Sequence, residues 1–284
     1  MGEILRFVWY DIRRLLTSPR LYFSLLVVYA CLRLCFGSVY LYPEESGESL
    51  QALELFIFAS CNRLPQCMLS IGVLLILGDT PFLHEGVSVY LIRTSRFRWL
   101  IGQILFCLVT IVCYMFVVEI MLLSMSGNGV SFANEWSDPV VLASQITSGA
   151  SLLYIDMIFT FPMNIILSGT PYAIFALTLL YNTFLLMTFV LICLVCNLNW
   201  KTGVGCFGVV ALLGWRSLID GYGNGRFSGL VLFSPCNLAT ISDRNVTRGT
   251  IIYTCMFFSC VCGFLTIWGY NKMRSLDVLK GEKE

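Results

Sequence analysis

Charged side chains are scarce in this sequence. Asp, Glu, Lys and Arg make up 12% of the 284 residues, about half of the roughly 25% that is usual in soluble domains. Hydrophobic residues reach 57%, and this excludes a water-soluble globular enzyme. The net charge is only +1, so there is no basic field that would attract nucleic acid, and no nucleic-acid partner is expected.

Groups that do chemistry are scarce as well. The single histidine, His84, removes most multi-histidine metal sites and proton relays. The 13 cysteines lie mostly inside apolar runs, where a thiol behaves as a small buried hydrophobic group. The sequence also lacks the G-x-x-x-x-G-K-[ST] motif that holds nucleotide phosphates. We therefore expect no catalytic residue, no metal site and no cofactor-binding residue on this chain.

Long uncharged runs are the main positive feature. A membrane helix needs roughly 20 mostly apolar residues, and the breaks between runs, among them Pro162 and Ser168-Gly169-Thr170-Pro171, divide the chain into six candidates. The sequence thus predicts an all-α integral membrane protein, with one transmembrane domain over residues 1–284. Its six transmembrane helices are predicted at about 21–42, 55–78, 99–123, 172–198, 203–219 and 250–270.

Two shorter segments complete the predicted architecture. Residues 1–20 alternate apolar and charged positions at helical spacing, the pattern of an amphipathic helix lying in the membrane interface. Glu3 and Asp11 interrupt this segment, which excludes a secretory signal there. Residues 227–241 are apolar but short and contain Pro235, so we predict a re-entrant hairpin before the last span, with its backbone buried in protein or lining a wet cavity.

The placement of positive charge predicts the orientation of the spans. With the N-terminus inside, 12 of the 18 Lys and Arg residues fall on the cytoplasmic side and four outside, as the positive-inside rule requires. Both termini are therefore expected in the cytoplasm. The outer segments collect acidic residues, among them Glu54, Glu135 and Asp138. This excess follows from the topology, although an acidic rim would also favour a cationic cargo.

The most informative loop follows the second predicted span. It runs from Gly78-Asp79-Thr80-Pro81 through "YLIRTSRFRWLIGQ" into the third span. Its polar, basic and aromatic residues suit a short helix that docks into a partner's groove. Ordinary positive-inside anchoring, with Trp99 at the interface, explains the same residues, and composition alone does not choose between the two. The residues of interest are His84, Glu85, Tyr90, Arg93, Arg96 and Arg98.

Taken together, the entry helix, the paired spans, the basic loop and the final span with a short basic tail resemble the membrane permease subunit of an ABC transporter of the type-2 exporter class. The resemblance covers essentially the whole chain. It implies a multi-pass protein of the bacterial inner (cell) membrane that pairs with a second permease subunit, identical or homologous, and with separate ABC ATPase subunits. It also implies that ATP is bound by these partners, and that the entry helix and the segment from His84 to Arg98 contact them.

Apart from Arg63, near the start of the second span, three charged residues fall inside predicted spans: Arg33, Glu119 and Arg216. Intramembrane charges are costly enough to be functional candidates, here as a polar lining of a translocation path or a dimer seam; structural pairing or snorkelling is the alternative. The run Gly203-Val204-Gly205-Cys206-Phe207-Gly208 has the form G-x-G-x-x-G. No strand precedes it, so close helix packing explains its glycines better than nucleotide binding.

The function expected from these observations is the permease subunit of an ATP-driven exporter. Its cargo is not identified by the residues, and a peptide, a drug and a lipid-like molecule all remain open. A secondary transporter or a non-transporting membrane scaffold is the alternative, although no internal repeat supports the first of these. An intramembrane enzyme is less well supported, because the spans offer one glutamate, no histidine and no pair of aspartates.

Overall fold

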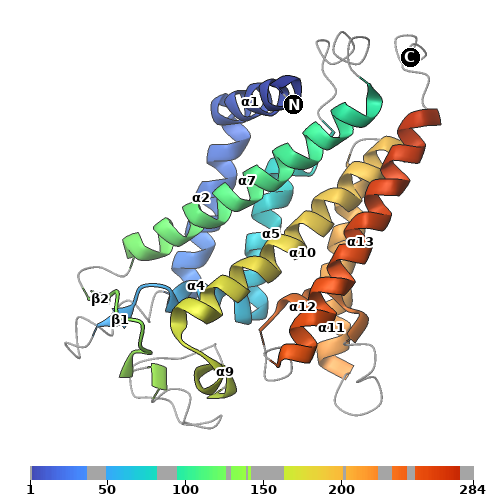
Figure 1. The fold of residues 1–284 in the computed structure, drawn as a ribbon. Coiled ribbons are helices and arrows are strands. Elements are labelled where there is room, and N and C mark those ends of the chain that lie inside the picture. Colours follow the sequence, from blue (N-terminus) through green and yellow to red (C-terminus); the bar gives the residue numbers. More distant parts are fainter. Residues whose placement is uncertain are drawn as a thin grey trace.

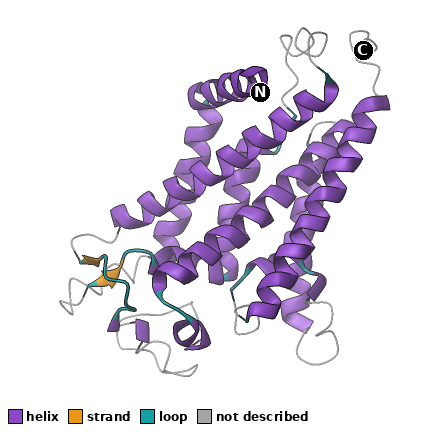
Figure 2. Cartoon of the chain, in the orientation of Figure 1, coloured by secondary structure: helices purple, strands orange, loops and turns teal. Residues whose placement is uncertain are grey.

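The computed structural model describes residues 2–36, 49–81, 95–125, 129–138, 140–141, 163–200, 203–222, 232–241 and 247–275. These residues are mostly helical, with two very short strands (Figure 2). The helices are α1 (Gly2–Thr17), α2 (Pro19–Phe36), α4 (Glu54–Cys61), α5 (Arg63–Leu77), α7 (Arg96–Met125), α9 (Met163–Ser168), α10 (Pro171–Asn199), α11 (Val204–Tyr222), α12 (Pro235–Ala239) and α13 (Arg248–Ser275), and the strands are β1 (Leu50–Gln51) and β2 (Val130–Ser131).

Six of the helices run up and down a common bundle in alternating directions. In Figure 1, α2, α7 and α11 descend from the end where α1 lies, while α5, α10 and α13 return to it. We call this the α1 end, and the opposite end, where β1 and β2 meet, the β end. The N-terminal helix and the last turn of α13 therefore lie at the same end of the bundle, which agrees with an even number of passes.

Four of the described helices are long and apolar enough to cross a membrane: α2, α7, α10 and α13. The protein is thus consistent with an all-α membrane protein, while six spans are not confirmed. The apolar part of α11, Val204–Arg216, is shorter than a span requires. The predicted break before the fourth span is present, since α9 ends at Ser168 and α10 begins at Pro171.

The second predicted span, residues 55–78, is not one continuous helix. Helices α4 and α5 meet at an angle of 91°, and the intervening Asn62 has an extended backbone with ψ 140°. The cause is Pro65, at the third position of α5. A proline lacks an N–H and its ring clashes with the carbonyl four residues earlier, so a helix cannot run through from Cys61 to Pro65.

Helix α10 occupies the centre of the bundle and contacts α4, α5, α7, α11, α12 and α13. Around it, small residues let neighbouring helices approach closely. Ser24, Val28, Leu32 and Phe36 form one buried seam along α2, and the Ser24 hydroxyl donates to the Gly72 carbonyl of α5 at 2.7 Å. A Cβ on Gly72 would lie 2.5 Å from Val28 Cγ2. The α2–α5 pair therefore depends on glycine at position 72.

The β end is closed by a small polar structure. Strands β1 and β2 are parallel, with Leu50 opposite Val130. Glu54 is fully buried, and its carboxylate accepts hydrogen bonds from the backbone N–H of Gln51 at 3.1 Å and from the N–H and hydroxyl of Ser137, each at 2.7 Å. Glu54 therefore ties the start of α4 to the segment after β2 and does not belong to an exposed acidic rim, whereas Glu135 and Asp138 are exposed.

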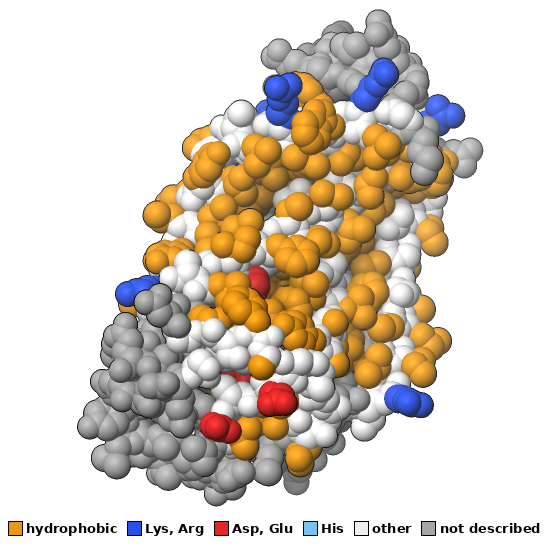
Figure 3. All heavy atoms as spheres, turned by 60° about the vertical axis from the view of Figure 1, so that its left-hand side comes forward, with side chains coloured by type: hydrophobic (Ala, Val, Ile, Leu, Met, Phe, Trp, Pro, Cys, Tyr) orange, Lys and Arg blue, Asp and Glu red, His pale blue; other side chains and the backbone are white. Residues whose placement is uncertain are grey.

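Figure 3 shows a broad hydrophobic surface between the two ends of the bundle, with several Lys or Arg side chains at the upper end and Asp or Glu side chains at the lower end. The exposed apolar side chains include Phe23 and Leu26 on α2 and Phe264 and Ile267 on α13. An exposed apolar surface of this extent is unusual on a soluble monomer. It is the surface that a lipid-embedded bundle presents.

Candidate coupling site

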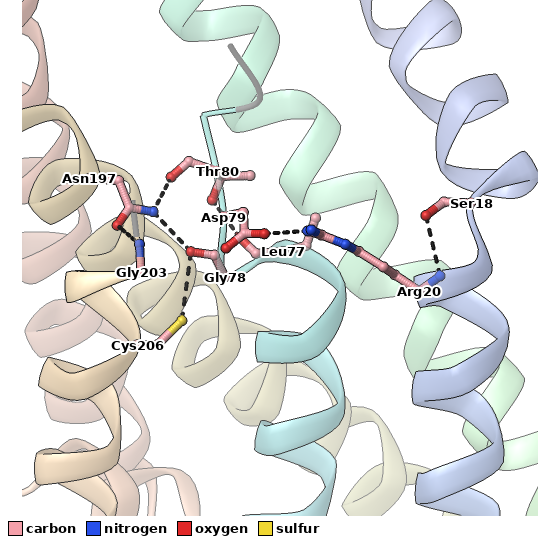
Figure 4. Close-up of polar contacts among 9 residues, drawn as sticks. All are labelled: Ser18, Arg20, Leu77, Gly78, Asp79, Thr80, Asn197, Gly203 and Cys206. Atoms are coloured by element: carbon pink, nitrogen blue, oxygen red, sulfur yellow. Dashed lines mark hydrogen bonds and ion pairs between the residues drawn. The ribbon is translucent and has the colours of Figure 1, made fainter. Parts of the chain in front are cut away.

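The residues that follow α5 form a polar junction at the α1 end, shown in Figure 4. Its centre is the buried side chain of Asn197, near the end of α10. The Asn197 amide nitrogen donates to the carbonyls of Gly78 at 2.9 Å and Thr80 at 2.7 Å, and its oxygen accepts from the backbone N–H of Gly203 at 3.1 Å. One amide therefore connects the end of α5, the end of α10 and the turn before α11.

A second contact ties the same residues to α2. Arg20 forms an ion pair with Asp79, and the backbone N–H of Arg20 donates a hydrogen bond to the Ser18 hydroxyl oxygen at 3.3 Å. Both charged side chains are partly exposed, so the pair contributes little to stability on its own. Its effect is positional, because it joins the first turn of α2 to the start of the loop after α5.

The glycines that resemble a nucleotide-binding motif belong to this junction. Gly203 has a φ of +94°, which a side chain rarely adopts. A Cβ on Gly205 would lie 2.3 Å from Cys193 Cα, so α11 and α10 touch backbone to backbone there. The Cys206 thiol contacts the Gly78 carbonyl at 3.7 Å. Gly205 therefore packs two helices together, as the sequence predicts for this run, whereas Gly203, where a Cβ would meet nothing within 4 Å, forms the turn before α11.

The other flank of the basic loop is held by α13. Arg96 opens α7 and its guanidinium donates to the Met273 carbonyl at 3.1 Å. The neighbouring Phe97 ring meets Tyr270 edge to face at a centroid distance of 5.5 Å. Trp99 is buried, so it is a core residue here. Arg98 is exposed.

Four of the predicted loop residues, His84, Glu85, Tyr90 and Arg93, lie outside the described residues. Arg96 and Arg98 are described, and both sit in the first turn of α7. Helix α7, which corresponds to the third predicted span, therefore starts at Arg96, three residues before the predicted start at Trp99. The described residues on either side of the loop, Gly78 to Pro81 and Ser95 to Arg98, are both anchored at the α1 end.

Helix α1 docks on α7 beside this junction. Phe7 lies against Gly102, where an added Cβ would meet the Phe7 ring at 2.9 Å. Deeper in the contact, Gln103 donates to the Asp11 carboxylate at 3.1 Å. Burial raises the pKa of Asp11 to about 6, while the Gln103 hydrogen bond and the charge of Arg14 lower it. Asp11 is thus buried at a helix contact.

A second polar cluster lies within the bundle. Arg216 of α11 is buried and donates to the side-chain oxygen of Gln66 on α5. The same oxygen accepts from the Thr240 hydroxyl, just after α12, at 3.0 Å. The Gln66 amide nitrogen lies 3.4 Å from the Asn182 side-chain oxygen on α10. Four elements therefore meet around one glutamine.

The sequence prediction included only Arg216 from this cluster. Gln66, Asn182 and Thr240 were not predicted, nor was Asn197 in the junction, because these side chains carry no charge. An amide inside an apolar run was the available signal, since a buried amide needs hydrogen-bond partners. Asp220 follows Arg216 by four residues, a spacing that allows a local pair on a helix, but its side chain lies outside the described ones.

The other two intramembrane candidates occupy different surroundings. Arg33 is exposed on α2, so it does not line the interior of this bundle. Glu119 on α7 is 6% exposed, and neither of its carboxylate oxygens has a hydrogen-bond partner among the described residues. The structure does not join Arg33, Glu119 and Arg216 into one site. Within the described part of the chain, no group of three or more His, Cys, Asp or Glu residues is suited to a metal ion.

Comparison of the chain with protein-family models, with curated proteins and with solved structures gave no match.

Proposed function

We propose that this protein is the membrane permease subunit of an ATP-driven exporter, that it works with a second permease subunit, and that separate ATPase subunits supply the energy. The observation that carries the proposal is the anchoring of the basic loop at both of its flanks. The Asn197 junction and the Arg20–Asp79 ion pair hold the first flank, and the Arg96–Met273 contact holds the second.

This arrangement suits a loop that a partner subunit pushes or pulls. A displacement of the loop would act on α5, α10 and α11 through Asn197 and on α13 through Arg96, so it would be transmitted to helices on both sides of α10. Rigid-body or hinge movement of packed helices is the usual result of such a displacement. An isolated surface loop, joined only to its own two helices, would transmit much less.

The orientation in this proposal places the α1 end in the cytoplasm. The exposed basic residues of the described chain favour it: Arg6, Arg13, Arg14, Arg20 and Arg98 lie at the α1 end, against Arg33, Arg63 and Arg248 towards the β end. The two described acidic residues exposed after β2, Glu135 and Asp138, lie at the β end. ATPase subunits are soluble proteins, so they would meet the loop and α1 from the cytoplasmic side.

The first test is affinity purification of the tagged chain from its native membrane in mild detergent, followed by mass spectrometry. The proposal expects a soluble chain with a phosphate-binding motif at roughly one copy per permease. A purification that preserves a control ABC complex but yields only this chain would contradict it, and would bring the secondary-transporter and scaffold alternatives forward.

The second test addresses the loop itself. The double variant Tyr90→Ala, Arg96→Ala should still insert in the membrane, yet ATP hydrolysis by the complex should no longer drive transport. The matched control is Arg248→Ala, an exposed arginine at the β end, for which hydrolysis and transport should remain coupled. Unchanged coupling in the double variant would remove the role assigned to the loop.

A further inference from the structure

The inference concerns the exposed face of α1. Docking on α7 buries one part of the apolar surface of α1 and leaves another part exposed. Phe7 and Val8 are buried against the bundle. Leu5, Trp9 and Leu16 form a second apolar stripe that stays exposed, at 57%, 64% and 53%. A stripe of this kind on an otherwise docked helix needs a partner of its own.

Among the described side chains of α1, the exposed charges are of one sign. Arg6, Arg13 and Arg14 are exposed on α1. The acidic Asp11 is buried and hydrogen-bonded to Gln103, so it offers no negative charge to the surface. On a helix with 100° between residues, Arg13 and Arg6 lie directly beside Trp9. The exposed surface of α1 is therefore an apolar stripe bordered by arginines, which complements a negatively charged, partly apolar surface.

The depth of α1 follows from the helix after it. Helix α1 ends at Thr17, and α2, which is long and apolar enough to span a membrane, begins at Pro19. Tyr22, Phe23 and Leu26 are already exposed apolar side chains in the first turns of α2. The boundary of the hydrocarbon therefore lies close to the turn at Ser18. Because α1 lies at the top of the bundle in Figure 1, the whole helix is near the level of the lipid headgroups.

We propose that α1 binds the anionic phospholipid surface of the membrane, with Leu5, Trp9 and Leu16 inserted at the acyl boundary and Arg6 and Arg13 on the headgroup phosphates. The stability of the docked helix then depends on the lipid composition of the leaflet. Each arginine near an anionic surface contributes enough to strengthen binding by about fivefold. Arg6 and Arg13 together should therefore account for about a 25-fold effect.

The experiment uses the full chain reconstituted in nanodiscs of phosphatidylcholine alone or with about one third phosphatidylglycerol. Hydrogen–deuterium exchange of the peptide covering residues 2–17 is followed in both. Wild-type protein should exchange at least tenfold more slowly in the anionic discs, and 1 M NaCl should remove most of the difference, because salt screens exposed charges. The variant Arg6→Gln, Arg13→Gln should lose most of it at low salt.

The matched control is Arg63→Gln, Arg248→Gln, which removes two exposed arginines at the β end and should leave exchange in α1 as in the wild type. A second variant, Leu5→Ser, Leu16→Ser, should speed exchange in both kinds of disc, since it removes the inserted stripe. Equal exchange of α1 in neutral and anionic discs would overturn the proposal. So would slowing that occurs only after a soluble ATPase is added, because α1 would then be a protein-docking surface.

The proposal is independent of the function proposed above. The comparison of neutral with anionic discs uses neither ATP nor an ATPase subunit, so its failure leaves the exporter assignment untouched. A purification without an ATPase would likewise leave the lipid contact of α1 untouched.

Discussion

The close approach of α10 and α11 can be tested at one atom, by the substitution Gly205→Ala. The new Cβ would lie 2.3 Å from the Cα and 2.9 Å from the carbonyl oxygen of Cys193. Carbon atoms rest at about 3.5–4.0 Å from one another, so the two helices would have to part by more than about 1 Å. Both contacts are to backbone, so no side-chain rotation can relieve them.

The expected cost follows from these contacts. Overpacking costs about 1–3 kcal/mol, and a clash with backbone that no side chain can relieve belongs at the upper end of this range. Separation of the helices would also lengthen the hydrogen bond from the Gly205 N–H to the Asn197 side-chain oxygen, already 3.4 Å. The higher helix propensity of alanine offsets up to about 1 kcal/mol of this destabilisation. The net loss should be about 2 kcal/mol, which corresponds to a fall in Tm of about 5 °C for a chain of this size.

The assay is thermal unfolding of the purified protein in detergent, with Gly214→Ala as the matched control. Gly214 lies in the same helix, and a Cβ there would meet nothing within 4 Å, so its Tm should stay level or rise. If the Tm of Gly205→Ala lies within about 1 °C of that of Gly214→Ala, which is about one fifth of the expected shift, the backbone contact between α10 and α11 is refuted.

Three further predictions concern the polar contacts. Asn197→Ala should lower the free energy of unfolding by about 3 kcal/mol, because it unpairs buried backbone groups at both ends of the junction. The control Asn199→Ala loses only a hydrogen bond to Val195 of its own helix and should cost less than about 1 kcal/mol. Equal Tm values for the two variants would contradict this. Since burial raises the pKa of Asp11 to about 6, the folded protein binds more protons than the unfolded chain between about pH 4 and 6. The contribution of Asp11 to stability is therefore greatest at low pH and falls as the pH rises to about 6. Asp11→Asn should flatten the curve of Tm against pH over that window and raise Tm at pH 7.5. An unchanged slope would refute the burial of an ionisable Asp11. In the polar cluster around Gln66, Gln66→Leu should cost about 3 kcal/mol, because it removes a hydrogen-bond acceptor from the buried guanidinium of Arg216. Adding Arg216→Met should restore part of the loss. Additive Tm changes in this double-mutant cycle would show that the two side chains do not interact.

Much of the helical framework could be predicted from the sequence. The predicted spans at 99–123, 172–198 and 250–270 fall inside α7, α10 and α13, because long apolar runs between proline, glycine and charged residues leave few alternatives to a membrane helix. The break before Pro171 was likewise predictable. The bend at Asn62 was predictable in principle from Pro65, but hydropathy alone passes over a single proline.

The polar contacts of the candidate site depended on the fold. Asn197 meets Gly78, 119 positions earlier in the chain, and Gln66 meets Thr240 across 174, so no local pattern could relate them. The loop residues from His84 to Arg93 stay a prediction, since they lie outside the described residues. Glu119 is buried on α7, and its assignment to a translocation path or a dimer seam stays a prediction.

The sequence by itself determined that this chain is mostly apolar helix with a basic amphipathic start, because hydropathy and period depend only on which residues follow one another. It did not determine which face of each helix would be buried. The apolar side of α1 is shared between α7 and the surface, Arg33 is exposed while Arg216 is buried, and Glu54 is enclosed by Ser137. Those outcomes arise from how rigid helices pack around α10, since packing one surface against another selects some residues for burial and leaves chemically similar ones exposed.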